Sequence, residues 1–94
     1  MANTQQWFTN NKKIGCALPC YKGGGITIKL IKHLHDIVDF IVLVDDACPL
    51  QTGKLAEKSF LESKKFYVLY NESNKGVGFS VKRAFTFLIQ QDCD

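Results

Sequence analysis

The chain alternates short apolar runs with longer segments of helical spacing. Three short runs, at 14–19, 40–45 and 66–70, are apolar and predict strands, and the run at 66–70 is rich in residues that favour β-strands. The segments 26–38, 53–63 and 77–91 repeat apolar residues every three or four positions, which predicts amphipathic helices. Strands and helices that alternate with short loops are typical of a parallel sheet with right-handed crossovers. We therefore predict an α/β fold with parallel strands and the element order β-α-β-α-β-α.

The run at 41–44 is the most apolar of the three and reads Ile-Val-Leu-Val, with no polar alternation. This pattern predicts a strand that is buried on both faces. Asp45 and Asp46 follow it directly, and Pro49 prevents the strand from continuing. In open α/β sheets, ligands bind at the carboxyl ends of the strands. Two interpretations stay open: the aspartates bind a ligand, or they cap a turn, where Asp is common.

Three loops are expected to meet at that edge of the sheet, at 19–25, 45–52 and 71–78. They offer the ring of Tyr21, backbone amides around glycines, the two carboxylates and the ammonium group of Lys75. These groups suit a nucleotide, because a ring can stack on a base, a carboxylate accepts from base N–H groups and an ammonium group attracts phosphate. The third loop also precedes a helix, whose positive end favours an anion. No Walker A or G-x-G-x-x-G pattern is present.

Composition narrows the classes that the chain can belong to. Its 94 residues allow one domain at most, and the polar segment 1–12 is expected to be flexible. A net charge of +3 from scattered basic residues predicts no nucleic-acid partner. Four cysteines without a C-x-x-C pair, with only two histidines, predict no zinc site. The chain contains neither an apolar run of ~20 residues nor a leading apolar region, so a cytoplasmic location is expected.

Three motifs in this order resemble the family-two glycosyltransferases, whose nucleotide-sugar domain has the GT-A fold. The motifs are LPCY at 18–21, FIVLVDD at 40–46 and NKGVGFSVKRAF at 74–85, and their spacing is also similar to that family. The resemblance covers about residues 13–94. It implies the N-terminal, nucleotide-binding part of a three-layer Rossmann-like (GT-A) domain that is incomplete in this chain.

The resemblance also implies a site for a UDP- or GDP-sugar. One of the two aspartates would bond to the base, and Asp46 is favoured over Asp45. The residues that the resemblance places in this site are Pro19, Cys20, Tyr21, Asp45, Asp46, Lys75 and Gly76. The chain departs from the family after Tyr21, where Lys22-Gly23 replace an Asn and an acidic residue, and after Asp46, where Ala47-Cys48 replace Gly-Ser. These departures bear on the identity of the base.

The catalytic groups implied by the resemblance fall outside this chain. In the family, a divalent metal (Mg²⁺ or Mn²⁺) is held by an Asp-x-Asp motif after a fourth strand, and a later carboxylate acts as the base. Asp92-Cys93-Asp94 has those letters, but it follows the last predicted helix directly. We therefore expect no catalytic residue and no metal ligand within the chain, and expect the chain alone to be inactive.

The implied parent enzyme is a hexosyltransferase of polysaccharide biosynthesis. It would transfer a sugar to a polyprenyl phosphate, another lipid-linked acceptor or a growing glycan, with membrane association through its missing C-terminal parts. One alternative is a non-catalytic Rossmann-like nucleotide-binding or scaffold domain. A second alternative is a phospho-acceptor signalling domain. It is disfavoured because it would need a third aspartate at the end of a later strand, where this chain has Tyr70-Asn71. An exposed sheet edge or the helix at 77–91 is expected to support a homo-oligomer.

Overall fold

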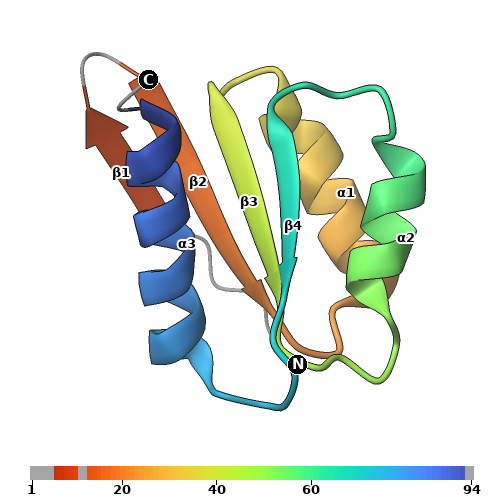
Figure 1. The fold of residues 1–94 in the computed structure, drawn as a ribbon. Coiled ribbons are helices and arrows are strands. Elements are labelled where there is room, and N and C mark those ends of the chain that lie inside the picture. The colour runs from red at the N-terminus through yellow and green to blue at the C-terminus, as the bar shows by residue number, and fades with distance from the viewer. Residues whose placement is uncertain (1–5, 11–12, 93–94) are drawn as a thin grey trace.

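The structure is a computed structural model, and it describes residues 6–10 and 13–92. One four-stranded sheet has the spatial order β1-β2-β3-β4 (Figure 1). The strands are β1 (Gln6–Asn10), β2 (Lys13–Cys20), β3 (Phe40–Asp45) and β4 (Phe66–Tyr70), and the helices are α1 (Gly24–His35), α2 (Thr52–Ser59) and α3 (Val77–Asp92). From β2 onward the order is β-α-β-α-β-α, and β2, β3 and β4 run parallel. The predicted α/β, Rossmann-like half-fold is confirmed.

The elements form three layers, with α1 and α2 on one face of the sheet and α3 on the other (Figure 1). Side chains alternate between the two faces of a strand, so β3 contributes to both cores. Its Ile41 and Leu43 pack in the core toward α1 and α2, whereas Val42 and Val44 pack with α3. All four have no exposed surface. The prediction that this strand is buried on both faces is therefore confirmed.

The structure departs from the prediction at residues 6–10, which were expected to belong to a flexible segment at 1–12. They form β1, which pairs antiparallel with β2 from Gln6 opposite Ala17 to Asn10 opposite Lys13. The sequence of β1 is QWFTN, whose adjacent Trp7 and Phe8 show neither a longer apolar run nor an alternation, so the hydrophobic pattern alone did not indicate a strand. The rest of the expected flexible segment, 1–5 and 11–12, lies outside the described residues.

Two of the helices are shorter than the predicted segments. Helix α1 ends at His35 rather than at 38, and α2 ends at Ser59 rather than at 63. After α1 the chain turns toward β2, where Asp39 and Ile14 bond twice. The Asp39 N–H donates to the Ile14 carbonyl over 2.8 Å, and the Asp39 carboxylate accepts from the Ile14 N–H over 2.7 Å. This pairing fixes where the chain leaves the helix layer and enters β3.

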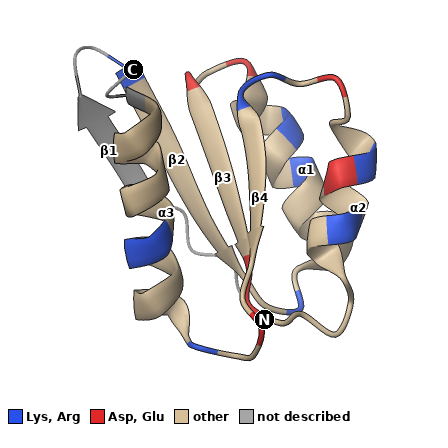
Figure 2. Cartoon of the chain, viewed as in Figure 1, with Lys and Arg blue, Asp and Glu red and all other residues tan. Residues whose placement is uncertain are grey.

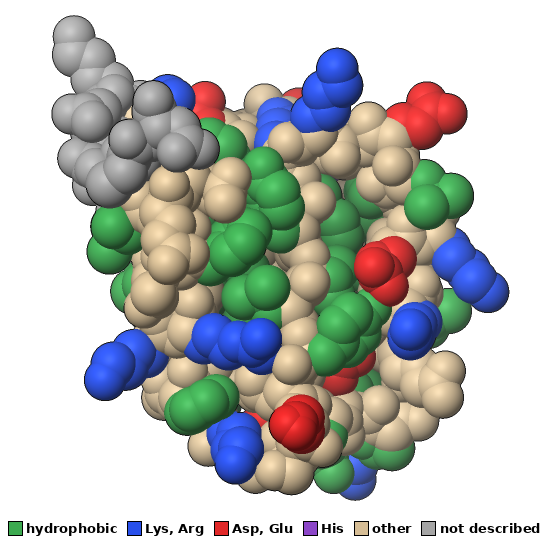
Figure 3. All heavy atoms as spheres, in the orientation of Figure 1, with side chains coloured by type: hydrophobic (Ala, Val, Ile, Leu, Met, Phe, Trp, Pro, Cys, Tyr) green, Lys and Arg blue, Asp and Glu red, His purple; other side chains and the backbone are tan. Residues whose placement is uncertain are grey.

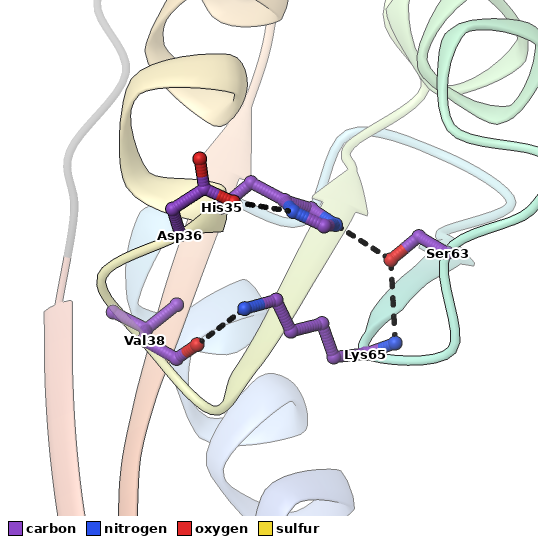
Figure 4. Close-up of polar contacts among 5 residues, drawn as sticks. All are labelled: His35, Asp36, Val38, Ser63 and Lys65. Carbon is purple, nitrogen blue, oxygen red and sulfur yellow. Dashed lines mark hydrogen bonds and ion pairs between the residues drawn. The ribbon is translucent and has the colours of Figure 1, made fainter.

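Polar contacts also close the edge of the sheet where β3 and β4 begin (Figure 4). The imidazole Nε2 of His35 lies 2.7 Å from the Ser63 hydroxyl, and the same hydroxyl accepts the Lys65 N–H over 3.3 Å. The Lys65 ammonium group donates to the Val38 carbonyl over 3.0 Å. These contacts hold the turn after α1 against the segment before β4. They stabilise the fold at the edge opposite to the predicted ligand site.

Candidate functional site

Backbone hydrogen bonds join the loops that follow β2, β3 and β4. The Asp46 N–H donates to the Cys20 carbonyl, and the Asn71 N–H donates to the Asp45 carbonyl, each over 2.9 Å. Figure 2 shows acidic positions at this end of β3 and basic positions in the neighbouring loops. The three loops therefore meet at the carboxyl edge of the parallel strands, as the topology predicts.

Asp46 is the main organiser of the loop that precedes α3. Its Oδ1 accepts the Asn71 side-chain amide over 2.8 Å and the Lys75 N–H over 2.7 Å, while Oδ2 accepts the Gly76 N–H over 2.8 Å. Burial raises the pKa of this carboxyl group, but the bonds from Lys75, Asn71 and Gly76 outweigh it and hold the pKa below its usual value. The carboxylate is therefore charged at neutral pH and fixes the loop at 71–76.

Asn71 extends this network into α3. Its side-chain amide also donates to the Ser80 hydroxyl over 3.0 Å, and its carbonyl oxygen accepts from Nη1 of Arg83 over 2.8 Å. The same Nη1 donates to the Tyr70 carbonyl over 2.7 Å. Neither Asn71 nor Arg83 was predicted as a site residue. Asn71 directly follows a strand and Arg83 lies on the next helix, which is only a weak indication of a site. Their hydrogen-bond partners are distant in sequence, so no local pattern identifies them.

Asp45 has a different role from its neighbour. Its Oδ1 accepts the Cys48 N–H over 2.7 Å, and its Oδ2 accepts the Gly53 N–H over 2.8 Å. Gly53 lies in the first turn of α2, where backbone N–H groups have no partner within the helix. Asp45 thus caps α2 from the end of β3, which agrees with the turn-capping interpretation. Only 4% of each aspartate is exposed.

The predicted residues of the first loop differ in accessibility. Pro19 and Cys20 are buried in β2, where they lie opposite Val44 and Asp45 of β3. The Cys20 thiol points into the core and lies 3.6 Å from the Thr27 hydroxyl. Tyr21 is half-buried, so part of its ring is accessible. Of these three predicted residues, Tyr21 is the one whose side chain can contact a ligand without rearrangement of the core.

Two neighbouring cavities lie beside α3, and one of them borders the loop that Asp46 fixes. One encloses about 380 Å³ beside Asn71, Lys75 and Arg83, and the other encloses about 510 Å³ between β4 and α3. Both share Phe79 and Arg83, and both volumes are typical of ligand pockets. Figure 3 shows hydrophobic side chains between α3 and β4, with Lys and Arg side chains around the lower part of this face. The site thus combines apolar surface with positive charge.

The first two loops are also joined through Cys48. Its sulfur accepts the Lys22 N–H over 3.0 Å and lies 3.2 Å from the Thr52 hydroxyl, which accepts the Gly24 N–H over 2.9 Å. Burial raises the pKa of the Cys48 thiol, but hydrogen bonds from Thr52, the following loop and Lys22 lower it below the usual value. Cys16 has no exposed surface, and burial raises the pKa of its thiol to about 11.

This contrast predicts different thiol reactivity in the folded protein. We expect iodoacetamide at slightly alkaline pH to alkylate Cys48 at least about tenfold faster than Cys16, because the thiolate is the reactive form. Peptide mass spectrometry over a time course measures both rates. In urea, where the folded environment is lost, the two rates should become equal. Equal rates in the folded protein, or faster labelling of Cys16, would contradict the proposed stabilisation of the Cys48 thiolate.

Within residues 6–10 and 13–92, no three His, Cys, Asp or Glu side chains are grouped to hold a metal ion. Of the motif Asp92-Cys93-Asp94, Asp92 ends α3, and 93–94 lie outside the described residues. None of the described helices is long and apolar enough to cross a membrane. Comparison of the chain with family models, curated proteins and solved structures finds no match.

Proposed function

We propose that this chain is the nucleotide-binding part of a GT-A glycosyltransferase and that it binds the nucleoside diphosphate of a UDP- or GDP-sugar. The observation that supports this proposal is the set of bonds from Asn71, Lys75 and Gly76 to Asp46. Those bonds form a rigid loop beside a cavity at the carboxyl edge of the strands, where open α/β sheets bind ligands. The order of the three sequence motifs supplies the choice of a nucleotide sugar.

The proposed binding mode assigns a role to each group of the site. The ring of Tyr21 stacks on the base. Asp46 is only 4% exposed and already accepts three hydrogen bonds, so its main role is to fix the loop, and a base N–H would use its one remaining acceptor position. The ammonium group of Lys75 and the first turn of α3 attract the diphosphate. A Cβ at Gly76 or Gly78 would have no atom within 4 Å, so the backbone there is open to a ligand.

Catalysis is assigned to the whole enzyme rather than to this chain. The described residues provide no set of three side chains that fits the Mg²⁺ or Mn²⁺ ion of the family, so no step is assigned to a metal here. Transfer of the sugar to a polyprenyl phosphate or glycan would need a metal site and a base from other parts of the protein. Within this proposal, the chain binds and orients the leaving nucleotide.

Titration of a ¹⁵N-labelled sample with UDP and GDP tests this proposal. We expect amide shifts to concentrate at 19–25, 44–48 and 74–78, with little change from inorganic phosphate at equal ionic strength. Shifts confined to other parts of the chain, or no shift with either nucleotide, would contradict the proposed site.

A matched pair of lysine variants tests the role of Lys75. Lys75→Ala should weaken UDP binding about two- to fivefold, since an exposed ion pair contributes up to about 1 kcal/mol. It should leave uridine binding unchanged, because the ammonium group is assigned to phosphate. Lys58→Ala, on the exposed side of α2, removes the same charge away from the site and should leave both affinities unchanged. Equal effects of the two variants would show only a dependence on net charge.

A further inference from the structure

Strand β4 has an open edge within the described sheet. It pairs with β3 on one side, from Ile41 opposite Phe66 to Asp45 opposite Tyr70, and no described strand lies on its other side. The Ile41 N–H donates to the Lys65 carbonyl, and the Asn71 N–H donates to the Asp45 carbonyl, so the backbone groups of 65 and 71 face β3. Because successive residues of a strand alternate, the backbone groups of 66, 68 and 70 face away from the sheet.

The composition of β4 does not protect this edge. Its sequence is FYVLY, with no charged residue and no proline among the five positions. Edge strands of monomeric proteins commonly carry lysine, proline or a bulge, which prevent pairing with another chain. Tyr67, Val68 and Leu69 are each half-buried, so part of their apolar surface is exposed along the strand. The edge is therefore suited to pairing with another strand.

We propose that two copies of this chain associate through antiparallel pairing of their β4 strands, with Val68 opposite Val68. In this register Phe66 lies opposite Tyr70, and all three outward-facing residues of one copy meet outward-facing residues of the other. Val68 and the two Phe66–Tyr70 pairs then exchange backbone hydrogen bonds. The Tyr70 carbonyl accepts from Arg83, but a carbonyl oxygen has two lone pairs and can accept a second bond. The arrangement has two-fold symmetry, as most homodimers do.

Charge complementarity supports the same register. Lys64 lies four positions before Val68 and Glu72 lies four positions after it, and both side chains are exposed. Both residues lie in the bends that flank β4, so antiparallel pairing about Val68 brings Lys64 of each copy toward Glu72 of the other. Opposite charges that meet across a strand pair stabilise the pairing. A shift by two residues in either direction removes both of these pairs, so the charges and the backbone pattern select one register.

Pairing in this register also covers apolar surface beside α3. Tyr67 and Leu69 share the α3 face of the sheet. In the dimer, Tyr67 of each copy would lie opposite Leu69 of the other copy. Such non-hydrogen-bonded pairs bring side chains close together. The cavity between β4 and α3, which includes Leu69, Phe79 and Phe87, opens next to this edge (Figure 3). The second copy would thus extend the apolar floor of the cavity. This inference goes beyond the proposed nucleotide site and does not depend on it.

Sedimentation equilibrium over a series of protein concentrations tests the proposal. The wild-type chain should show a monomer–dimer equilibrium, and Lys64→Glu should weaken dimerisation about tenfold, because two attractive pairs become repulsive in each dimer. Glu72→Lys should have the same effect. The double variant Lys64→Glu/Glu72→Lys should restore dimerisation, since it exchanges the two charges. Lys58→Glu makes the same change of charge on α2 and should leave dimerisation unchanged.

Val68→Pro provides a second test. The Val68 N–H faces away from β3, so proline removes a bond to the second copy while it leaves the bonds to β3 in place. Dimerisation should be lost, and circular dichroism should show whether the fold is kept. A wild-type chain that remains monomeric at all concentrations would overturn the proposal. The proposal would also be overturned if Lys64→Glu and Glu72→Lys each dimerised as strongly as the wild-type chain. In that case the double variant would have no lost dimerisation to restore.

Discussion

Replacing Asp46 with alanine is expected to lower the free energy of unfolding by about 2–4 kcal/mol, because hydrogen bonds to a buried charge are among the strongest in a protein. The change removes the acceptor of the Lys75 N–H. It leaves the Asn71 amide and the Gly76 N–H with only their second acceptors, Ser80 and Asn74. The loop before α3 should lose its fixed conformation. Urea denaturation measures the loss, and hydrogen exchange at 74–76 should accelerate. A loss below about 1 kcal/mol would show that water replaces the carboxylate at little cost.

Asp46→Asn is the matched control, since it keeps one oxygen as an acceptor and removes the charge. Its destabilisation should be smaller than that of Asp46→Ala, and it should change the pH dependence of stability. The folded protein holds the pKa of Asp46 below its usual value, so the unfolded chain takes up this proton first as the pH falls. Stability from this group is present above about pH 4 and is lost as the pH falls through the folded pKa. The acid-induced loss should therefore be shallower in Asp46→Asn.

Gly53→Ala is expected to lower the free energy of unfolding by about 1–3 kcal/mol, although alanine favours a helix more than glycine does. A Cβ at this position would lie 2.6 Å from Cε1 of Tyr70, 2.8 Å from Oδ2 of Asp45 and 3.1 Å from Cβ of Asp45. The Asp45 oxygen is already held by the Gly53 N–H, and the Tyr70 hydroxyl donates to Glu57, so neither neighbour can move without losing a bond. Urea denaturation measures the effect.

Gly78→Ala is the matched control for this substitution. It lies in the first turn of α3, and a Cβ there would have no atom within 4 Å. This substitution should raise the free energy of unfolding by about 0.4–1 kcal/mol, because alanine restricts the unfolded chain more than glycine does. Equal stability changes in Gly53→Ala and Gly78→Ala would mean that the close contacts at Gly53 relax without cost.

The parts of the fold that could be predicted from the sequence are those with a strong local pattern. The bounds of β3 and β4 agree with the predicted runs at 40–45 and 66–70. The uninterrupted apolar residues of β3 and the aspartates that end it set its length. Strand β1 was not predicted, because its one apolar pair, Trp7-Phe8, is too short to show an alternation within the otherwise polar first twelve residues.

The meeting of the three loops was predictable from the sequence, but the contacts among their residues were not. Parallel topology was sufficient to bring the loops after β2, β3 and β4 to one edge. The separate roles of Asp45 and Asp46 depend on partners such as Gly53 and Gly76, which no local pattern identifies. The bonds from Asn71 to Asp46 and from Arg83 to Asn71 likewise join residues of different elements. A tandem aspartate pair therefore indicated a place in the fold, while the structure was needed to separate its two functions.

The position of α3 has a consequence for the order in which the protein can fold during synthesis. This helix is the last described element, yet its Ala84 and Leu88 pack against Ala17 of β2 and Val42 of β3. A ribosome must therefore add about 70 residues after Ala17 before that face of the sheet can be covered, because folding proceeds as segments emerge. Until then, the nascent sheet has one apolar face without its helix. This interval is when a chaperone that recognises apolar segments would have its longest access to the chain.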